Sequence, residues 1–367
     1  MSRIMRMTAL ALVALCGLAR AAVAQQEKPQ GQFEGQVTVN EVLLDVLVTD
    51  AKGNVIVGLD KNDFVVTENG KPVDLTGVTF YSNRRLIQSS PALAKQGIKV
   101  EQVPEDRYFI LLFEDQKDTA QEAPQLLSQQ MEAAKRARGW IEGDLLTNDW
   151  VAVASYDTRL KVQQDFTHNR KALIEAVGDA MKGKEREGNY PSRIDAGKGP
   201  SLFAGLPRGE ELRSKTSTLY EAMQALARAA GNVRGRKNLL LFTFGLPGRV
   251  DPFGHFVPDK HFFEPTVRAL NANNVAAYTI DLTPPAVEHT LSDSLNKLAD
   301  DTGGRYFFNV TNFSTPLDQV AQENNGYYLL SYTSGQPAGK SGFQEVEVKV
   351  TNPEFRVKAR RGYEYGK

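Results

Sequence analysis

Apolar and polar residues alternate along the segments near both ends of the chain. In VLLDVLVTD, one face of the expected strand carries Val42, Leu44, Val46 and Val48. The stretches DAKGN (50–54) and ENGKP (68–72) contain residues that close hairpin turns. After residue 325, YYLLSY, FQEVEVKV and FRVKARRGYEY repeat the alternation. Because a period of two is typical of half-buried strands, we expect an antiparallel β module built from the N- and C-terminal segments.

The middle of the chain has a different pattern. Continuous apolar runs occur at RYFILLF (107–113), WVAVASY (150–156), NLLLFTF (238–244) and NVAAYTIDL (274–282). Such runs are typical of strands that are buried on both faces. Helical stretches separate them, and the first has an apolar stripe of Leu127, Met131, Ala134 and Ile141. Strands that alternate with helices predict a doubly wound, mostly parallel sheet covered on both faces.

These patterns divide the chain into segments. An N-terminal β segment spans residues 25–83, and the aperiodic, proline-containing residues 84–105 form a linker. The αβ pattern covers residues 106–324, and we expect the C-terminal strands of 325–367 to pack with the N-terminal segment. Residues 182–215 are rich in Gly, Pro and charge and exceed ordinary connections in length, which favours a mobile insertion.

The first 24 residues have the layout of a secretory signal peptide. Arg3 and Arg6 precede an apolar run, and Ala22 and Ala24 form a small-residue cleavage site. We therefore expect cleavage after Ala24 and an exported protein, either secreted or periplasmic. The only cysteine is Cys16, so the mature chain would have no thiol for a disulfide, a nucleophile or a metal ligand. No later stretch approaches the roughly 20 apolar residues of a spanning helix, so we expect no stable membrane insertion.

Charge and motifs exclude several functions. Lys plus Arg and Asp plus Glu balance at 44 each, so no basic excess indicates nucleic acid. We find no G-x-S-x-G elbow and no Ser, His and Asp order typical of a hydrolase, so we expect no catalytic residues. His255 and His261 lie among Pro and Gly, which favours a solvated loop over a metal site. Lys358 and Arg360 share one face of a strand, which favours a solvated edge.

Four longer stretches together resemble the bacterial family named the VWFA-related Acidobacterial domain. They are VLVTDAKGNVIVGLDKNDFVVTENGKPV, STLYEAMQALA, LADDTGGRYFFNV and EVKVTNPEFRVKARRGY. The αβ middle is similar to a von Willebrand factor type A (VWFA) domain. The resemblance implies a ligand site at the carboxyl ends of the strands, which is also the general location for open αβ sheets.

The resemblance further implies a place for Mg²⁺. In VWFA domains the ion is often held by Asp-x-Ser-x-Ser after the first strand, a Thr on a second loop and an Asp after the fourth strand. The corresponding positions here carry Glu114, Gln116, Asp118, Ser217 and Phe244. Mg²⁺ requires a near-octahedral shell of oxygen ligands, and a phenylalanine supplies none. We therefore expect a degenerate metal site and no cofactor; if a cation binds, its ligands are Glu114, Asp118 and Ser217.

The sequence therefore favours an exported, non-catalytic protein-binding or scaffold protein that binds a protein partner through its VWFA-like domain. Two alternatives remain. The first is a Mg²⁺-dependent adhesion module that binds a carboxylate of its partner. The second is a hydrolase or enzyme accessory that uses the acidic residues of 114–118.

Overall fold

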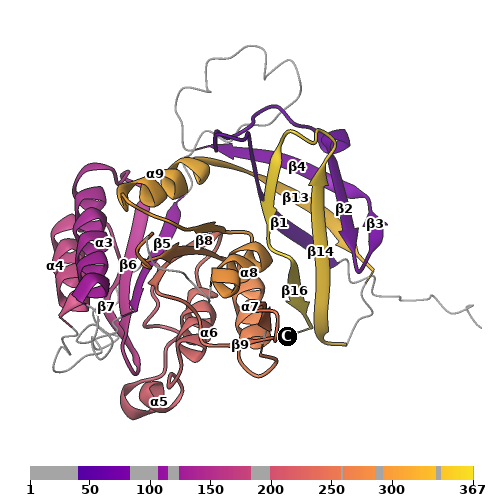
Figure 1. Ribbon diagram of the computed structural model, residues 1–367. Coiled ribbons are helices and arrows are strands. Elements are labelled where there is room, and N and C mark those ends of the chain that lie inside the picture. Colours follow the sequence, from indigo (N-terminus) through magenta and orange to yellow (C-terminus); the bar gives the residue numbers. More distant parts are fainter. Residues whose placement is uncertain are drawn as a thin grey trace, which may run out of the picture. The chain divides into compact units, whose positions relative to one another are not determined.

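A computed structural model describes residues 40–82, 106–114, 124–182, 199–257, 259–285, 292–335 and 340–366. The described residues all belong to one compact unit, whose helices and strands are shown in Figure 1. The predicted signal peptide (1–24) and linker (84–105) lie outside the described residues, as do Gln116, Asp118 and the first part of the predicted insertion.

A six-stranded sheet forms the centre of the αβ part. Its strands are β5 (Arg107–Glu114), β6 (Asp149–Tyr156), β7 (Leu160–Thr167), β8 (Lys237–Thr243), β11 (Val275–Asp281) and β12 (Arg305–Phe307). Their spatial order is β12-β11-β8-β5-β6-β7, and every neighbouring pair is parallel except β6 and β7. Counted along the chain, this is the 3-2-1-4-5-6 order of a doubly wound fold. The predicted fold class is confirmed.

Helices cover both faces of this sheet. One face packs against α6 (Leu219–Ala230), α7 (Phe263–Ala272) and α8 (Ser292–Thr302). The other packs against α3 (Pro124–Gly143), α4 (Arg170–Met181) and α9 (Ser314–Glu323). Both cores are apolar because the central strands present Val, Leu, Ile and Phe to each side.

The apolar stripe predicted for α3 is partly wrong. Ala134 and Ile141 are buried, but Leu127 and Met131 are exposed by 44% and 61%. The buried face consists of Gln130, Ala133, Ala134, Ala137, Trp140 and Ile141. Small alanines let α3 lie close to the sheet, so the face that packs is rotated away from the two longer side chains.

Both ends of the chain build the β module, as predicted. One sheet has the order β15 (Arg356–Ala359), β1 (Asn40–Thr49), β13 (Gly326–Ser334) and β4 (Leu75–Ser82). The other has the order β16 (Gly362–Tyr365), β14 (Gly342–Val350), β2 (Phe64–Glu68) and β3 (Lys71–Val73). All their pairs are antiparallel, and a short helix η1 (Lys61–Asp63) precedes β2. Side chains that include Leu44, Phe80, Tyr328 and Tyr332 form the shared core.

The predicted mobile insertion (182–215) is packed against the αβ part from Gly199 onward. This segment includes α5 (Gly209–Ser214), and it buries Leu202, Phe203, Leu206 and Leu212. Asp165 of β7 accepts hydrogen bonds from the Leu202 N–H at 2.7 Å and the Ser201 hydroxyl at 2.5 Å. Apolar burial and these hydrogen bonds fix the described part of the segment, from Gly199 onward, although its Gly and Pro content favoured mobility.

The solvated edge predicted for Lys358 and Arg360 is also wrong. Lys358 Nζ lies 2.6 Å from Glu323 Oε2 of α9, and Glu323 is only 1% exposed. Arg360 is half-buried and donates to the carbonyl oxygens of Leu43 and Asn271. The β strands therefore contact the αβ part through buried charged groups, a feature that the strand pattern alone does not reveal.

Two buried lysines predict an unusual dependence of stability on pH. Burial lowers the pKa of Lys237 to about 8, and burial lowers that of Lys358 to about 8 in spite of Glu323. An unfolded lysine has a pKa of about 10.4, so between these values the unfolded chain binds more protons than the folded one. Stability therefore rises as the pH rises, and we expect each lysine to contribute a gain of roughly 2 kcal/mol between about pH 8 and 10.

Urea unfolding across this range measures the gain. The window ends near pH 10 because burial raises the pKa of tyrosines such as Tyr328, and their ionisation opposes folding above that pH. Lys237→Met should reduce the slope, whereas Lys135→Met, at an exposed site, should leave it unchanged. A stability that is flat or falls between pH 8 and 10 would contradict the assignment.

Candidate functional site

Four polar side chains form a row at the carboxyl edge of the central sheet. The register places Glu114 of β5 opposite Tyr156 of β6, and Thr243 of β8 opposite Asp281 of β11. β5 and β8 are themselves neighbours and run parallel. The order along the edge is therefore Tyr156, Glu114, Thr243 and Asp281, at the position where open αβ sheets bind their ligands.

The centre of the row is held by hydrogen bonds among its own members. The Thr243 hydroxyl donates to Glu114 Oε2 and accepts from the Gly245 N–H at 3.1 Å. Gln130 of α3 donates to the Glu114 carbonyl oxygen at 2.7 Å. The carboxylate of Glu114 is thereby fixed against the end of the neighbouring strand.

Ser217, the hydroxyl predicted on the second loop, forms a hydrogen bond at the start of a helix. Ser217 Oγ donates to Glu221 Oε2 at 2.7 Å, and Glu221 forms a capping box with Thr218 at the start of α6. Burial raises the pKa of Glu221, but hydrogen bonds from Ser217 and Thr218 outweigh it and lower the pKa overall. Tyr156 donates to the Ser217 carbonyl oxygen at 2.8 Å, and burial raises the pKa of Tyr156 to about 12.

Phe244 occupies the third predicted position and lies in the core. Its side chain is 9% exposed and belongs to the core on the side of α3, α4 and α9. Phe113 of β5 and Phe242 of β8 belong to the same core, and their rings stack on each other with centroids 4.6 Å apart. Phe244 therefore acts as an apolar plug and offers little contact surface of its own.

Three of the five positions that the resemblance assigns to Mg²⁺ lie among the described residues, namely Glu114, Ser217 and Phe244. Glu114 and Ser217 supply oxygens that bond to neighbouring side chains, and Phe244 supplies none. Within the described ranges, no group of three or more His, Cys, Asp and Glu residues is arranged to hold a metal ion. These three described positions alone supply fewer oxygens than the octahedral shell of Mg²⁺ requires.

Sequence reasoning missed the far end of the row. Tyr306 of β12 donates to Asp281 Oδ2 at 2.9 Å, and both burial and Asp281 raise the pKa of Tyr306. Phe308, which follows β12, stacks on Tyr306 at a centroid distance of 5.6 Å and is 64% exposed. The parallel register of β11 and β12 places both aromatic residues at the carboxyl edge.

A hairpin that follows β8 was missed as well. It consists of β9 (Arg249–Val250) and β10 (Phe256–Val257), and Phe253 in its turn is 84% exposed. Asp251 Oδ1 accepts from the N–H groups of Phe253 and His255, both at 2.9 Å, so the turn is tightly defined. The sequence signal was present, because Asp251, Pro252 and Gly254 are typical turn residues.

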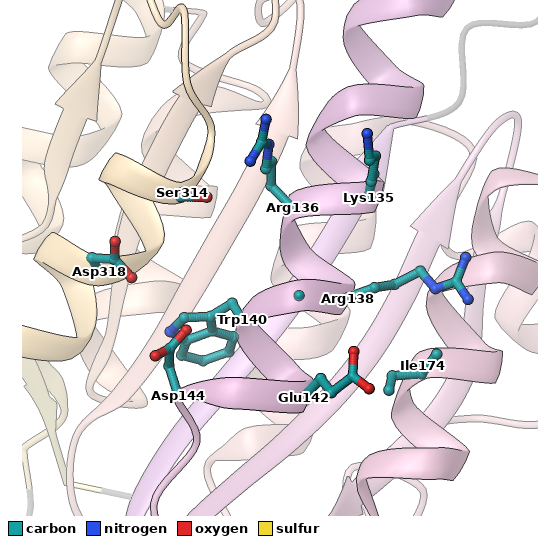
Figure 2. A pocket seen from close by; sticks show the side chains of 10 residues that line it. Lys135, Arg136, Arg138, Trp140, Glu142, Asp144, Ile174, Ser314 and Asp318 are labelled. Carbon is teal, nitrogen blue, oxygen red and sulfur yellow. The ribbon is translucent and has the colours of Figure 1, made fainter.

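A cleft lies between α3 and α9 and has a volume of about 710 Å³ (Figure 2). Basic and acidic side chains both line it, and burial together with Asp144 raises the pKa of Asp318. No histidine is among its lining residues in the described part of the chain.

The six-stranded sheet, with its strand order and its helices on both faces, has a doubly wound, Rossmann-like αβ fold. No family model matches the chain, and no curated protein sequence matches it either. Similar solved structures include an aerotolerance-related membrane protein from Bacteroides fragilis. It is 9% identical, with 60% of this chain and 98% of that chain covered and a TM-score of 0.36.

Two further solved structures are similar to this chain. Proximal thread matrix protein 1 from the mussel byssus, with a zinc-occupied MIDAS motif, is 13% identical, with 59% and 47% coverage and a TM-score of 0.35. The VWA domain of SpRpn10 is 13% identical, with 58% and 94% coverage and a TM-score of 0.32. Among helices of the described residues, none is both long and apolar enough to cross a membrane.

Proposed function

We propose that this protein is an exported, non-catalytic binding or scaffold protein, and that it binds a protein partner at the carboxyl edge of its VWFA-like sheet without a metal ion. The observation that carries the proposal is the combination of a rigid polar row with exposed aromatic side chains on the segments that follow β8 and β12. The polar groups bond to one another, while Phe253 and Phe308 present their rings to solvent.

Exposed aromatic residues on fixed supports suit protein recognition. Aromatic anchors carry much of the free energy of protein–protein binding, and they cost little conformational entropy when their backbone is already ordered. The hydrogen bonds of Asp251 order the turn of Phe253, and the stacking on Tyr306 orders Phe308. The predicted binding-face positions Glu114, Ser217 and Phe244 then hold the loops in place rather than contact a metal.

The test uses the mature protein as bait for an envelope extract in buffer with EDTA. Wild type should retain a partner, and the double variant Phe253→Ala with Phe308→Ala should lose it, because both anchors are removed. Val65→Thr alters an exposed residue on β2 and should retain the same partner. Equal capture by the double variant and the wild type would refute this binding face.

Metal independence has its own test. We expect Mg²⁺ to leave the thermal unfolding of the mature protein unchanged. A ligand present at roughly 100 times its dissociation constant stabilises a protein by about 2.7 kcal/mol, so a comparable site would be visible. A Mg²⁺-dependent shift that Glu114→Ala abolishes would favour the adhesion module instead. A hydrolytic activity of the mature protein that is lost in the Glu114→Ala variant would favour the hydrolase.

A further inference from the structure

A groove with a largely apolar floor runs between α3 and α4 and has a volume of about 870 Å³. Leu127, Met131 and Ala134 line it from α3, and Val177 and Met181 line it from α4. It contains none of the residues of the polar row at the sheet edge. A role for this groove is therefore independent of the function proposed above.

The apolar residues of the groove lie at helical spacing and are unusually open to solvent. Leu127 and Met131 are one turn apart on α3 and are among the exposed large hydrophobic side chains of the described residues. Methionine is flexible and polarisable, and it adapts to partners of different shape. Met131 and Met181 face the groove from opposite helices. This composition suits an apolar ligand face.

A glycine in the middle of α4 keeps the groove open. Glycine destabilises the interior of a helix relative to alanine, so its presence calls for a reason. At Gly178 an added Cβ would meet nothing within 4 Å, so no close packing requires the glycine. Gly178 lines the groove, and the missing side chain adds to its width.

The rim of the groove is basic. Lys135 and Arg138 line it from α3 and Lys182 from the end of α4, whereas Glu132 is the only acidic side chain among its described lining residues. Figure 2 shows Lys135 and Arg138 projecting outward from α3. A ligand for this groove therefore combines apolar residues with negative charge.

We propose that the groove binds an acidic amphipathic helix of a partner protein. Such a helix would place its apolar residues over the floor and its carboxylates against the basic rim, as in other helix-in-groove complexes. The charge pattern disfavours the chain's own segments as occupants. Residues 83–105 and 183–198 have more Lys and Arg than Asp and Glu, and 115–123 has no large apolar residue. Residues 25–39 of the mature chain have only three charged side chains, Glu27, Lys28 and Glu34, too few to match the basic rim.

The test measures fluorescence anisotropy with a labelled peptide of about 18 residues that has leucines on one helical face and glutamates on the other. Its partner peptide has lysines in place of the glutamates. The glutamate peptide should bind the mature protein at least about tenfold more tightly than the lysine peptide. Raising the salt from about 0.05 to 0.5 M should weaken this preference, because the rim charges are exposed.

Two glycine substitutions separate binding from folding. Gly178→Leu should keep or raise the melting temperature and weaken peptide binding at least about tenfold, since the new side chain enters the groove. Gly139→Leu is the matched control, because Gly139 also has open space at its Cβ but lines the cleft between α3 and α9 instead. It should leave peptide binding unchanged.

Three outcomes of the peptide measurements would overturn the proposal. They are equal binding of the two peptides, no measurable binding of the glutamate peptide, and unchanged binding by a folded Gly178→Leu variant. Replacement of residues 184–197 by a Gly-Ser linker tests the chain's own segment as the occupant. We expect the same peptide affinity after this replacement, and a large gain in affinity would identify that segment as the occupant and refute a partner helix.

Discussion

Glu323→Gln should lower the free energy of unfolding by about 3–5 kcal/mol, the loss typical of breaking a buried ion pair from one side. Glu323 lies at the end of α9 and is the anion for two cations of other elements. Lys358 of β15 lies 2.6 Å from Oε2, and Arg305 of β12 lies 2.8 Å from Oε1. Glutamine keeps the volume but removes the charge, so both cations would remain buried without their counterion.

Arg305 approaches Glu323 as an ion pair, while Oε1 of Glu323 has no aligned hydrogen bond. Arg305 also donates to Gln319 at 2.9 Å, so it keeps one partner in the variant. Lys358 depends on Glu323 more strongly, because its Nζ donates to this carboxylate. The loss of stability should therefore arise mainly from Lys358.

Chemical denaturation of the mature protein measures this change. Glu347→Gln is the control, because Glu347 pairs with Lys349 at 2.8 Å on the surface, and exposed pairs contribute about 0–1 kcal/mol. The double variant Glu323→Met with Lys358→Met should recover part of the loss, since apolar replacement of both partners removes the buried charge. A loss below about 1 kcal/mol for Glu323→Gln would show that the pair contributes little.

The strands of the central sheet were predictable because their signal is local. RYFILLF and NLLLFTF each contain several consecutive apolar residues, and so short an apolar run is typical of a strand buried on both faces. The β module was predictable for a similar reason, since Val42, Leu44, Val46 and Val48 alternate with residues of the opposite face. The exposure of Leu127 was not predictable, because helical spacing alone does not say which of two neighbouring stripes faces the sheet.

The contacts of charged residues depend on pairings between distant parts of the chain. Lys358 on an alternating strand has the pattern of an exposed residue, and only the approach of Glu323, 35 positions away, buries it. The same applies to the candidate site. The resemblance placed Glu114, Ser217 and Phe244 on adjacent loops, but the bonds of Ser217 to Glu221 and of Thr243 to Glu114 follow from the packed loops. Phe308 carried no signal in its own neighbourhood.

Asp149→Asn should have an effect of similar size in the αβ part, with a loss of about 3–5 kcal/mol. Asp149 at the start of β6 holds Arg107 at the start of β5 through two bonds, Nε to Oδ1 at 2.6 Å and Nη2 to Oδ2 at 2.7 Å. Both side chains are almost fully buried. Asparagine would point an N–H group at one guanidinium nitrogen and leave the cation without its counterion.

The consequences should extend beyond the two strands. Arg107 Nη1 also donates to the Ala321 carbonyl oxygen at 2.8 Å and to Asn325 Oδ1 at 3.0 Å, so the guanidinium fixes the end of α9 where the chain enters β13. Hydrogen exchange should therefore speed up in α9 as well as in β5 and β6. Glu132→Gln, which breaks an exposed pair with Arg136, should cost less than about 1 kcal/mol and leave α9 protected. Unchanged exchange in α9 of a destabilised Asp149→Asn variant would show that Arg107 does not hold this helix, because the lost charge would then act on the strands alone.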